Sequence, residues 1–273
     1  MTTIETQAEL PPRPRSLRRL SPRWRWLLLP GSVLAGLLAW EALVRLNHYP
    51  AFILPLPGKV WVRFLAVLAD GTLARHTQVT LIEVFIGLAL GLGAASTLGY
   101  LIAKSHSLEQ ALTPYIVASQ SIPVVAIAPI LVIWFGSGLR SKVLICALIV
   151  FFPILVNTVI GVRSVEPDLR DLMRSLKATR LQTLLQLELP AALPILLGGL
   201  KIGATLSVIG AVVGEFVGAD RGLGFLISLG RGQYDTALVF VAVGALVFIA
   251  MSLYALVALL EKVLLVWKRE EAK

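Results

Sequence analysis

The stretch GVRSVEPDLRDLMRSLKATRLQTLLQLELPAA, residues 161–192, is the longest polar segment inside the hydrophobic part of the chain. Its first half predicts a short helix that begins at Pro167, because proline is favoured at the first helical position. Asp168 and Asp171 suit the positive end of the helix dipole. The segments before and after this stretch are apolar, so it is a polar connection between two apolar segments.

The second half of the stretch predicts another short helix. Thr179 is a favourable N-cap, and Gln182 three positions later completes a capping box. We expect Pro190 to end this helix, because proline removes a backbone donor. The two helices would be joined by a turn near Lys177 and Ala178.

The composition of the whole chain is that of an integral membrane protein. Of its 273 residues, 57% are hydrophobic and 15% charged, against roughly 45–50% and about 25% in ordinary soluble domains. The net charge is +9, but the Lys and Arg residues lie at the ends and in short connections, and only 8% of residues are aromatic. A nucleic-acid-binding protein would need aromatic side chains on which bases can stack, and few are present. The positive charge instead lies where a membrane protein carries it, so we expect a lipid bilayer and no nucleic acid as partner.

Six apolar stretches approach or reach the roughly 20 residues that a membrane-spanning helix needs. They are residues 26–46, 79–103, 112–135, 143–162, 193–217 and 236–260. The first is compatible with a signal peptide, but it exceeds the usual apolar core of about 7–15 residues, which favours a retained span. Lys and Arg number 16 on the side of the two termini and 8 on the other, which predicts cytosolic termini.

This assignment divides the chain into segments. Residues 1–25 form a disordered basic cytosolic tail, 26–46 the first span, 47–78 an outer segment, 79–262 the membrane core with the polar loop at 163–190, and 263–273 a second cytosolic tail. Within the outer segment, KVWVRFLAVLAD (59–70) has apolar residues at helical spacing. It predicts a helix that either lies on the outer membrane surface or packs on the protein itself.

Small residues recur at every fourth position in the second and fifth spans, which puts them on one face of each helix. Close approach of backbones is a main source of contact energy between helices in lipid, so these faces are expected to meet other helices. The residues are Gly87, Gly91, Ala95 and Gly99, then Gly199 and Gly203, then Gly210, Gly214 and Gly218.

Three ionisable residues fall inside predicted spans, where a central charge costs about 2.5–3.5 kcal/mol. They are Glu83, Lys201 and Glu215. Lys201 and Glu215 either extend to the membrane edges or line a transport path. Ser119 and Gln120, beside a kink-forming proline cluster, are further candidates for the path.

The chain offers no catalytic or metal-binding constellation. Cys146 is the single cysteine, and the three histidines are far apart in sequence, whereas an enzyme or metal site needs clustered ligands at one depth. No G-x-x-x-x-G-K-[ST] motif is present, so ATP hydrolysis would need a partner. We expect no cofactor. A self-sufficient channel or ion-driven transporter stays an alternative, although it predicts paired charges at mid-membrane and needs no structured cytosolic platform.

The polar loop resembles the EAA loop in permease subunits of bacterial ATP-binding-cassette (ABC) importers. That pattern is E-A-A, three residues, G, nine residues, I, one residue, L-P, and Leu189-Pro190 match its end. The places of E-A-A, the glycine and the isoleucine are taken by Asp171, Leu172 and Met173, by Lys177, and by Leu187. Glycine would ease a turn with positive φ, so the lysine costs on the order of 1–2 kcal/mol if that conformation is kept. If that conformation is not kept, the turn has a different shape from the one in the family.

Three further stretches resemble the nitrate, taurine and aliphatic-sulfonate permease subfamily. They are LPLPGKV (54–60), SIPVVAIAPILVIWFG (121–136) and IGAVVGEFVGADRGLGFLI (209–227). Within that subfamily, GGLKIGATLSVIGAVVGEF (198–216) is most similar to the branch for vitamins or their pyrimidine precursors, riboflavin included.

The resemblance implies a fold, a multi-pass location in the bacterial inner membrane and a set of partners. The fold is all-α, with six spans and the loop between spans four and five as a coupling element. The partners are a pair of cytosolic ATP-binding subunits, an extracytoplasmic solute-binding protein and a second permease copy, which makes a homodimer. Residues implied in contact with the ATPase are Arg170, Asp171, Arg174, Ser175, Lys177 and Ala178, the first three expected to be exposed.

Overall fold

The computed structural model describes residues 22–265, and all regular structure in that part of the chain is helical. The chain divides into two units, residues 1–49 and 50–273. The first unit contains α1 (Pro22–Leu46), a 25-residue helix that includes the whole of the predicted first span, residues 26–46. The predicted tails lie largely outside the described residues. Where they are described, both are partly helical, because α1 already begins at Pro22 and α11 continues to Leu264.

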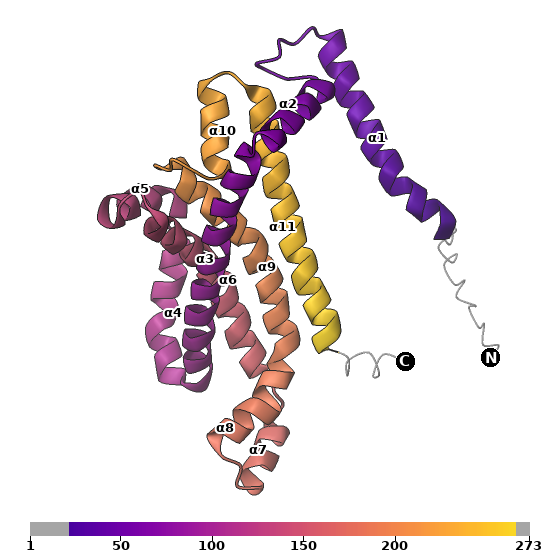
Figure 1. Ribbon diagram of the computed structural model, residues 1–273. Helices are drawn as coiled ribbons and strands as arrows, with labels where there is room; N and C mark the ends of the chain where they lie inside the picture. The colour runs from indigo at the N-terminus through magenta and orange to yellow at the C-terminus, as the bar shows by residue number, and fades with distance from the viewer. Residues whose placement is uncertain (1–21, 266–273) are drawn as a thin grey trace, which may run out of the picture. The chain divides into compact units, whose positions relative to one another are not determined.

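The second unit is a bundle of long helices with short ones at both ends (Figure 1). Its elements in chain order are α2 (Pro57–Ala69), α3 (Thr72–Lys104), α4 (His106–Gln120), α5 (Val124–Phe135), α6 (Leu139–Arg163), α7 (Pro167–Ser175), α8 (Arg180–Thr183), the π-helical turn η1 (Leu184–Glu188), α9 (Leu189–Phe216), α10 (Leu223–Gly232) and α11 (Thr236–Leu264).

Within the described residues, four helices are long and apolar enough to cross a membrane. They are α3, α6, the continuous helix Arg180–Phe216 that includes α9, and α11, and they contain four of the six predicted spans. The predicted span 112–135 differs from expectation, because α4 and α5 meet at 95° across a short break. Pro123 stands at that break, where proline removes a donor and disfavours helix in the residue before it.

The centre of the bundle is the packing of α6 against both α3 and α9. The small-residue faces make this possible. A Cβ added at Gly91 would lie 2.8 Å from the Ala147 carbonyl oxygen, and one at Gly210 would lie 2.7 Å from the Cα of Cys146. The prediction that these faces meet another helix is therefore confirmed, except for Gly218, which lies beyond the end of α9.

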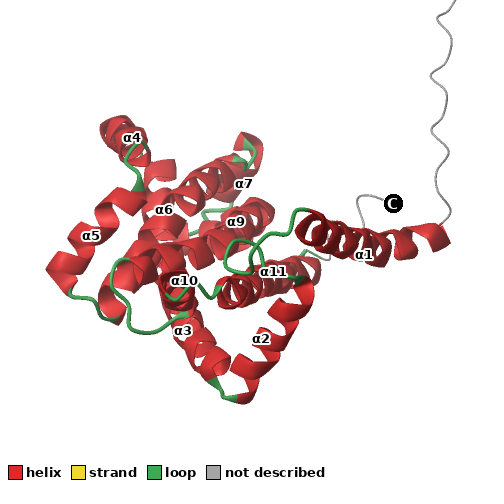
Figure 2. Ribbon diagram, turned by 90° about the horizontal axis from the view of Figure 1, so that it is seen from above, coloured by secondary structure: helices red, strands yellow, loops and turns green. Residues whose placement is uncertain are grey.

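The helix predicted at residues 59–70 is α2, and it packs on α11 and α3 (Figure 2). Phe64 and Val67 lie on the packed side, whereas Trp61, Val62 and Leu65 are exposed. The alternative that this helix packs on the protein itself is confirmed for one face.

The helix α10 was not expected from the sequence.

Candidate functional site

The polar loop folds into the two short helices that its sequence predicts. Pro167 begins α7, and the Thr179 hydroxyl accepts a hydrogen bond from the Gln182 backbone while the Gln182 side chain accepts one from the Thr179 N–H at 2.8 Å. Both halves of the capping box are present. The helices α7 and α8 form one end of the bundle, opposite the end that carries α10 (Figure 1).

The turn between the two helices keeps the conformation that favours glycine. Lys177 has φ of +54°, and the turn is closed by hydrogen bonds from the Lys177 and Ala178 N–H groups to the carbonyl oxygens of Arg174 and Met173, at 2.9 and 3.0 Å. The turn is thus of the left-handed kind, and the lysine bears a conformational cost.

We expect Lys177→Gly to stabilise the loop by about 1 kcal/mol, because glycine adopts this φ without a Cβ clash. Lys177→Ala is the matched control, since it removes the same charge but keeps the Cβ. Hydrogen exchange of the backbone amides in residues 167–183 measures the effect. Equal protection in both variants would contradict the conformational explanation.

One face of α7 is apolar and lacks cover within the described part of the chain. Leu169, Leu172 and Leu176 recur at helical spacing, with exposed fractions of 42%, 54% and 68%. Exposed leucines at the polar end of a bundle indicate a surface that another protein covers. Sequence reasoning chose the charged residues of this helix and missed the leucines, although their 3-and-4 spacing is the signal of an apolar face.

Two of the predicted coupling residues are exposed and bound to each other. The Arg174 guanidinium lies 2.8 Å from the Asp171 carboxylate, and both side chains are more than half exposed. The Ser175 hydroxyl donates to the Asp171 carbonyl at 3.0 Å. These three residues form a polar edge next to the leucines.

Arg170 differs from expectation. Its guanidinium Nη2 donates to the Val162 carbonyl oxygen at 2.6 Å, so the side chain is partly buried and attaches α7 to the last turn of α6. The expectation that Arg170 is exposed is wrong, because the free carbonyls at a helix end attract a cation.

We expect Arg170→Ala to loosen α7 by about 1–3 kcal/mol, the usual cost of an unsatisfied buried partner of a charged donor. Limited proteolysis within residues 163–176 measures this loss. Arg174→Ala is the control, because an exposed ion pair contributes only about 0–1 kcal/mol. Equal cleavage of the two variants would contradict the anchoring role.

The helix does not end at Pro190 as expected. The chain passes through α8 and η1 directly into α9, a continuous helix of 37 residues from Arg180 to Phe216. The π-helical turn inserts an extra residue just before the proline, and the Leu189 N–H bonds to the Leu184 carbonyl. That wider turn leaves room for the ring that would otherwise break the helix.

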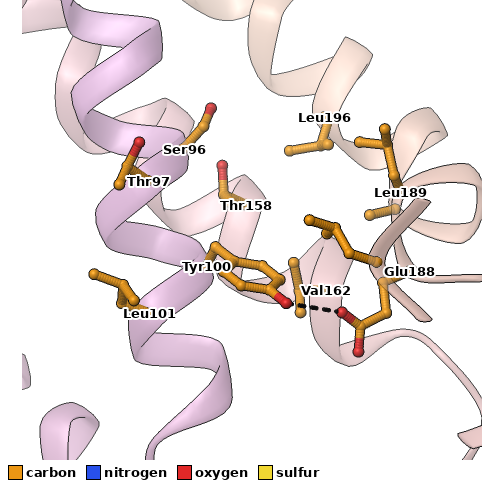
Figure 3. A pocket seen from close by; sticks show the side chains of 11 residues that line it. Ser96, Thr97, Tyr100, Leu101, Thr158, Val162, Glu188, Leu189 and Leu196 are labelled. Carbon is orange, nitrogen blue, oxygen red and sulfur yellow. Dashed lines mark hydrogen bonds between the residues drawn. The ribbon is translucent and has the colours of Figure 1, made fainter. Parts of the chain in front are cut away.

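The last residue of the π-helical turn links it to α3. The buried carboxylate of Glu188 pairs with Lys104 and accepts a hydrogen bond from the Tyr100 hydroxyl at 3.3 Å. Figure 3 shows this hydrogen bond between Tyr100 and Glu188, which both line a cavity of about 320 Å³, with Ser96 and Thr97 on the same helix as Tyr100. A second cavity, of about 630 Å³, lies beside it.

The four path candidates lie at three separate places. Ser119 and Gln120 end α4 at the break before α5. The Lys201 ammonium pairs with Glu261 of α11. Glu215 is 2% exposed. The alternative that its side chain extends to the outer membrane edge is therefore wrong.

Glu215 belongs to a buried polar cluster that joins α3, α6, α9 and α10. Its carboxylate accepts hydrogen bonds from the Thr80 hydroxyl, at 2.6 Å, and from the Gly224 N–H. The Lys142 ammonium lies 3.4 Å from Glu83, and both side chains are buried. Two carboxylates and one cation thus lie together in the buried interior, a juxtaposition that the sequence alone did not reveal.

Comparison with known proteins decides the family. The family described as "Binding-protein-dependent transport system inner membrane component" matches residues 87–265. The chain belongs to this family. It is a permease subunit and a multi-pass inner membrane protein. Permeases of this family work with an ATP-binding subunit, which holds the ATPase activity, and with a solute-binding protein.

Relatives of this permease agree with the resemblance seen in the sequence. It is 48% identical to the riboflavin transport system permease protein RibX of Chloroflexus aurantiacus, over 94% of this chain and 95% of that protein. It is 36% identical to the formylaminopyrimidine transport permease protein ThiX of Halalkalibacterium halodurans, over 94% and 99%. A structure of the MetNI methionine ABC transporter shares the fold, with a TM-score of 0.63 at 20% identity, over 72% of this permease and 97% of that chain.

Proposed function

We propose that this permease imports riboflavin or a related vitamin precursor that a binding protein delivers. The observation that carries the proposal is the 48% identity to a riboflavin permease over nearly the whole of both chains. The second relative, named for a formylaminopyrimidine, supports the same vitamin branch. Relatives named for aliphatic sulfonates and taurine are 31% and 30% identical, which makes those solutes the competing assignment.

We further propose that two copies pair around the path, each with six spans and cytosolic termini. Four to five apolar helices in the described residues and the charge bias of the connections support this topology. Ser119, Gln120, Lys201 and Glu215 remain the path candidates. Among them, the pair at the α4–α5 break is the better choice, because Lys201 and Glu215 are engaged with other helices.

In this proposal α7 is the element of the permease that the ATP-binding subunit contacts. Leu169, Leu172 and Leu176 provide the apolar contact, and Asp171, Arg174 and Ser175 provide polar contacts at its edge. Lys177 and Ala178 form the turn, and Arg170 positions the helix. Coupling requires that ATP favours one arrangement of the two α7 helices over the other.

The test is uptake by the complex reconstituted in liposomes with its ATP-binding subunit and binding protein. Labelled riboflavin should accumulate only with ATP, and an excess of unlabelled taurine should not compete. Saturable taurine uptake would replace the vitamin assignment with the sulfonate one. Equal riboflavin uptake by the permease alone would instead support a channel or an ion-driven transporter.

A further inference from the structure

The two cavities described above adjoin each other, because Tyr100, Leu101 and Glu188 line both of them. We consider them together as one site, with the first cavity as its inner part and the second as its outer part. The inner part extends along α3 to Ser96, which is eight residues before Lys104 and hence about 12 Å further along the helix axis. The outer part reaches α7 and α8.

The outer part is strongly basic. Four cationic side chains and a single carboxylate line it: Lys104, Arg170, Arg174 and Arg180, with Glu188. Lys104 pairs with Glu188, Arg170 with a carbonyl oxygen and Arg174 with Asp171. Arg180 forms no ion pair with any residue of the described part of the chain. The site therefore has a surplus of positive charge and at least one unengaged guanidinium.

The inner part has the opposite character. Apolar side chains from three helical segments dominate its lining, among them Leu184, Leu189 and Leu196, with the hydroxyls of Ser96, Thr97 and Thr158 between them. Leu101 and Leu189, at the rim, are 49% and 42% exposed. In the proposed topology both leucines lie at the level of the lipid chains, so the inner part would open sideways into the bilayer.

We propose that this site binds an anionic phospholipid of the cytosolic leaflet, with its phosphate among Lys104, Arg174 and Arg180 and the start of an acyl chain in the inner part. A basic pocket between spans on the cytoplasmic side suits an anionic head group. A soluble phosphate would not need the apolar half, and a zwitterionic lipid would not need the surplus charge. The inference rests on the proposed topology, which puts α7 in the cytosol.

The test measures lipid binding by the purified full-length permease in a neutral detergent, by native mass spectrometry and by thermal stabilisation. The probes are phosphatidylglycerol, phosphatidylcholine and inorganic phosphate. Phosphatidylglycerol should bind preferentially, and Arg180→Gln should weaken that binding about fivefold, the effect of one basic side chain near an anionic surface. Thr97→Phe, which fills the inner part, should weaken it without a change of charge.

Lys262→Gln is the matched control, because Lys262 is an exposed cation at the end of α11 and lines neither cavity. Equal binding of the two lipids, or equal effects of Arg180→Gln and Lys262→Gln, would overturn the proposal. Inorganic phosphate that competes as well as the lipid would indicate a site for a free anion instead and would also overturn it. Loss of the lipid when the ATP-binding subunit is added would show that the cavity belongs to the subunit interface, with the same consequence. Neither ATP nor a vitamin is present, so failure of the proposed uptake leaves this measurement unaffected.

Discussion

Replacing Leu172 and Leu176 together by serine is expected to reduce ATP-driven uptake strongly, by up to about 30-fold where the complex is limiting, while the permease still inserts normally. Both leucines are more than half exposed on α7, so the isolated permease loses little. If the ATPase covers them, each loses about 1 kcal/mol of apolar burial. A total near 2 kcal/mol corresponds to about a 30-fold weaker complex.

The measurements are co-purification of the ATP-binding subunit and vitamin uptake at matched expression. Asp171→Ala with Arg174→Ala is the comparison, because that exposed ion pair contributes less, about 0–1 kcal/mol. We expect the charge variant to weaken the complex by a smaller factor than the leucine variant. Normal uptake by the leucine variant would remove the apolar face of α7 from the coupling site.

The second large effect is expected from Lys142→Met. The Lys142 ammonium lies 3.4 Å from the buried carboxylate of Glu83, and Glu215 is the second buried carboxylate of the same cluster. Breaking a buried pair by removing one partner costs about 3–5 kcal/mol, because the remaining charge stays uncompensated. The variant should therefore be much less stable, with a lower unfolding temperature and poor recovery from the membrane.

The control is Arg140→Met, two positions earlier on α6, where the side chain is exposed. It removes the same charge from the same helix and should be close to neutral. Adding Glu83→Gln to Lys142→Met should restore part of the stability, because it removes an uncompensated charge. An unchanged unfolding temperature for Lys142→Met would contradict the importance of the buried cluster.

Local rules predicted the loop and the long helices well. The capping box at Thr179 and the helix start at Pro167 depend on neighbouring residues only. The close approach of α3 and α9 to α6 followed from every fourth residue being small. Helix starts, caps and small-residue faces can be predicted from the sequence because each depends on residues that are close together in the chain.

What the sequence did not predict depends on contacts between distant residues. The carbonyl of Val162 that holds Arg170, the Glu261 that pairs with Lys201 and the cluster around Glu215 come from other elements. Pro190 was misjudged for a similar reason. A proline normally breaks a helix, and only the preceding π-helical turn makes it compatible with one.

The π-helical turn has a consequence for how force moves through the permease. Because it joins α8 to α9 without a break, residues Arg180–Phe216 form one continuous helix of 37 residues, about 55 Å along its path. A tilt of the α8 end would then be transmitted along the helix to its other end, beside Glu215 and α10, unless the helix bends at the π-helical turn or at Pro194. Spin labels at the two tips should therefore report a constant separation through the ATP cycle, and a change in that separation would reveal a joint.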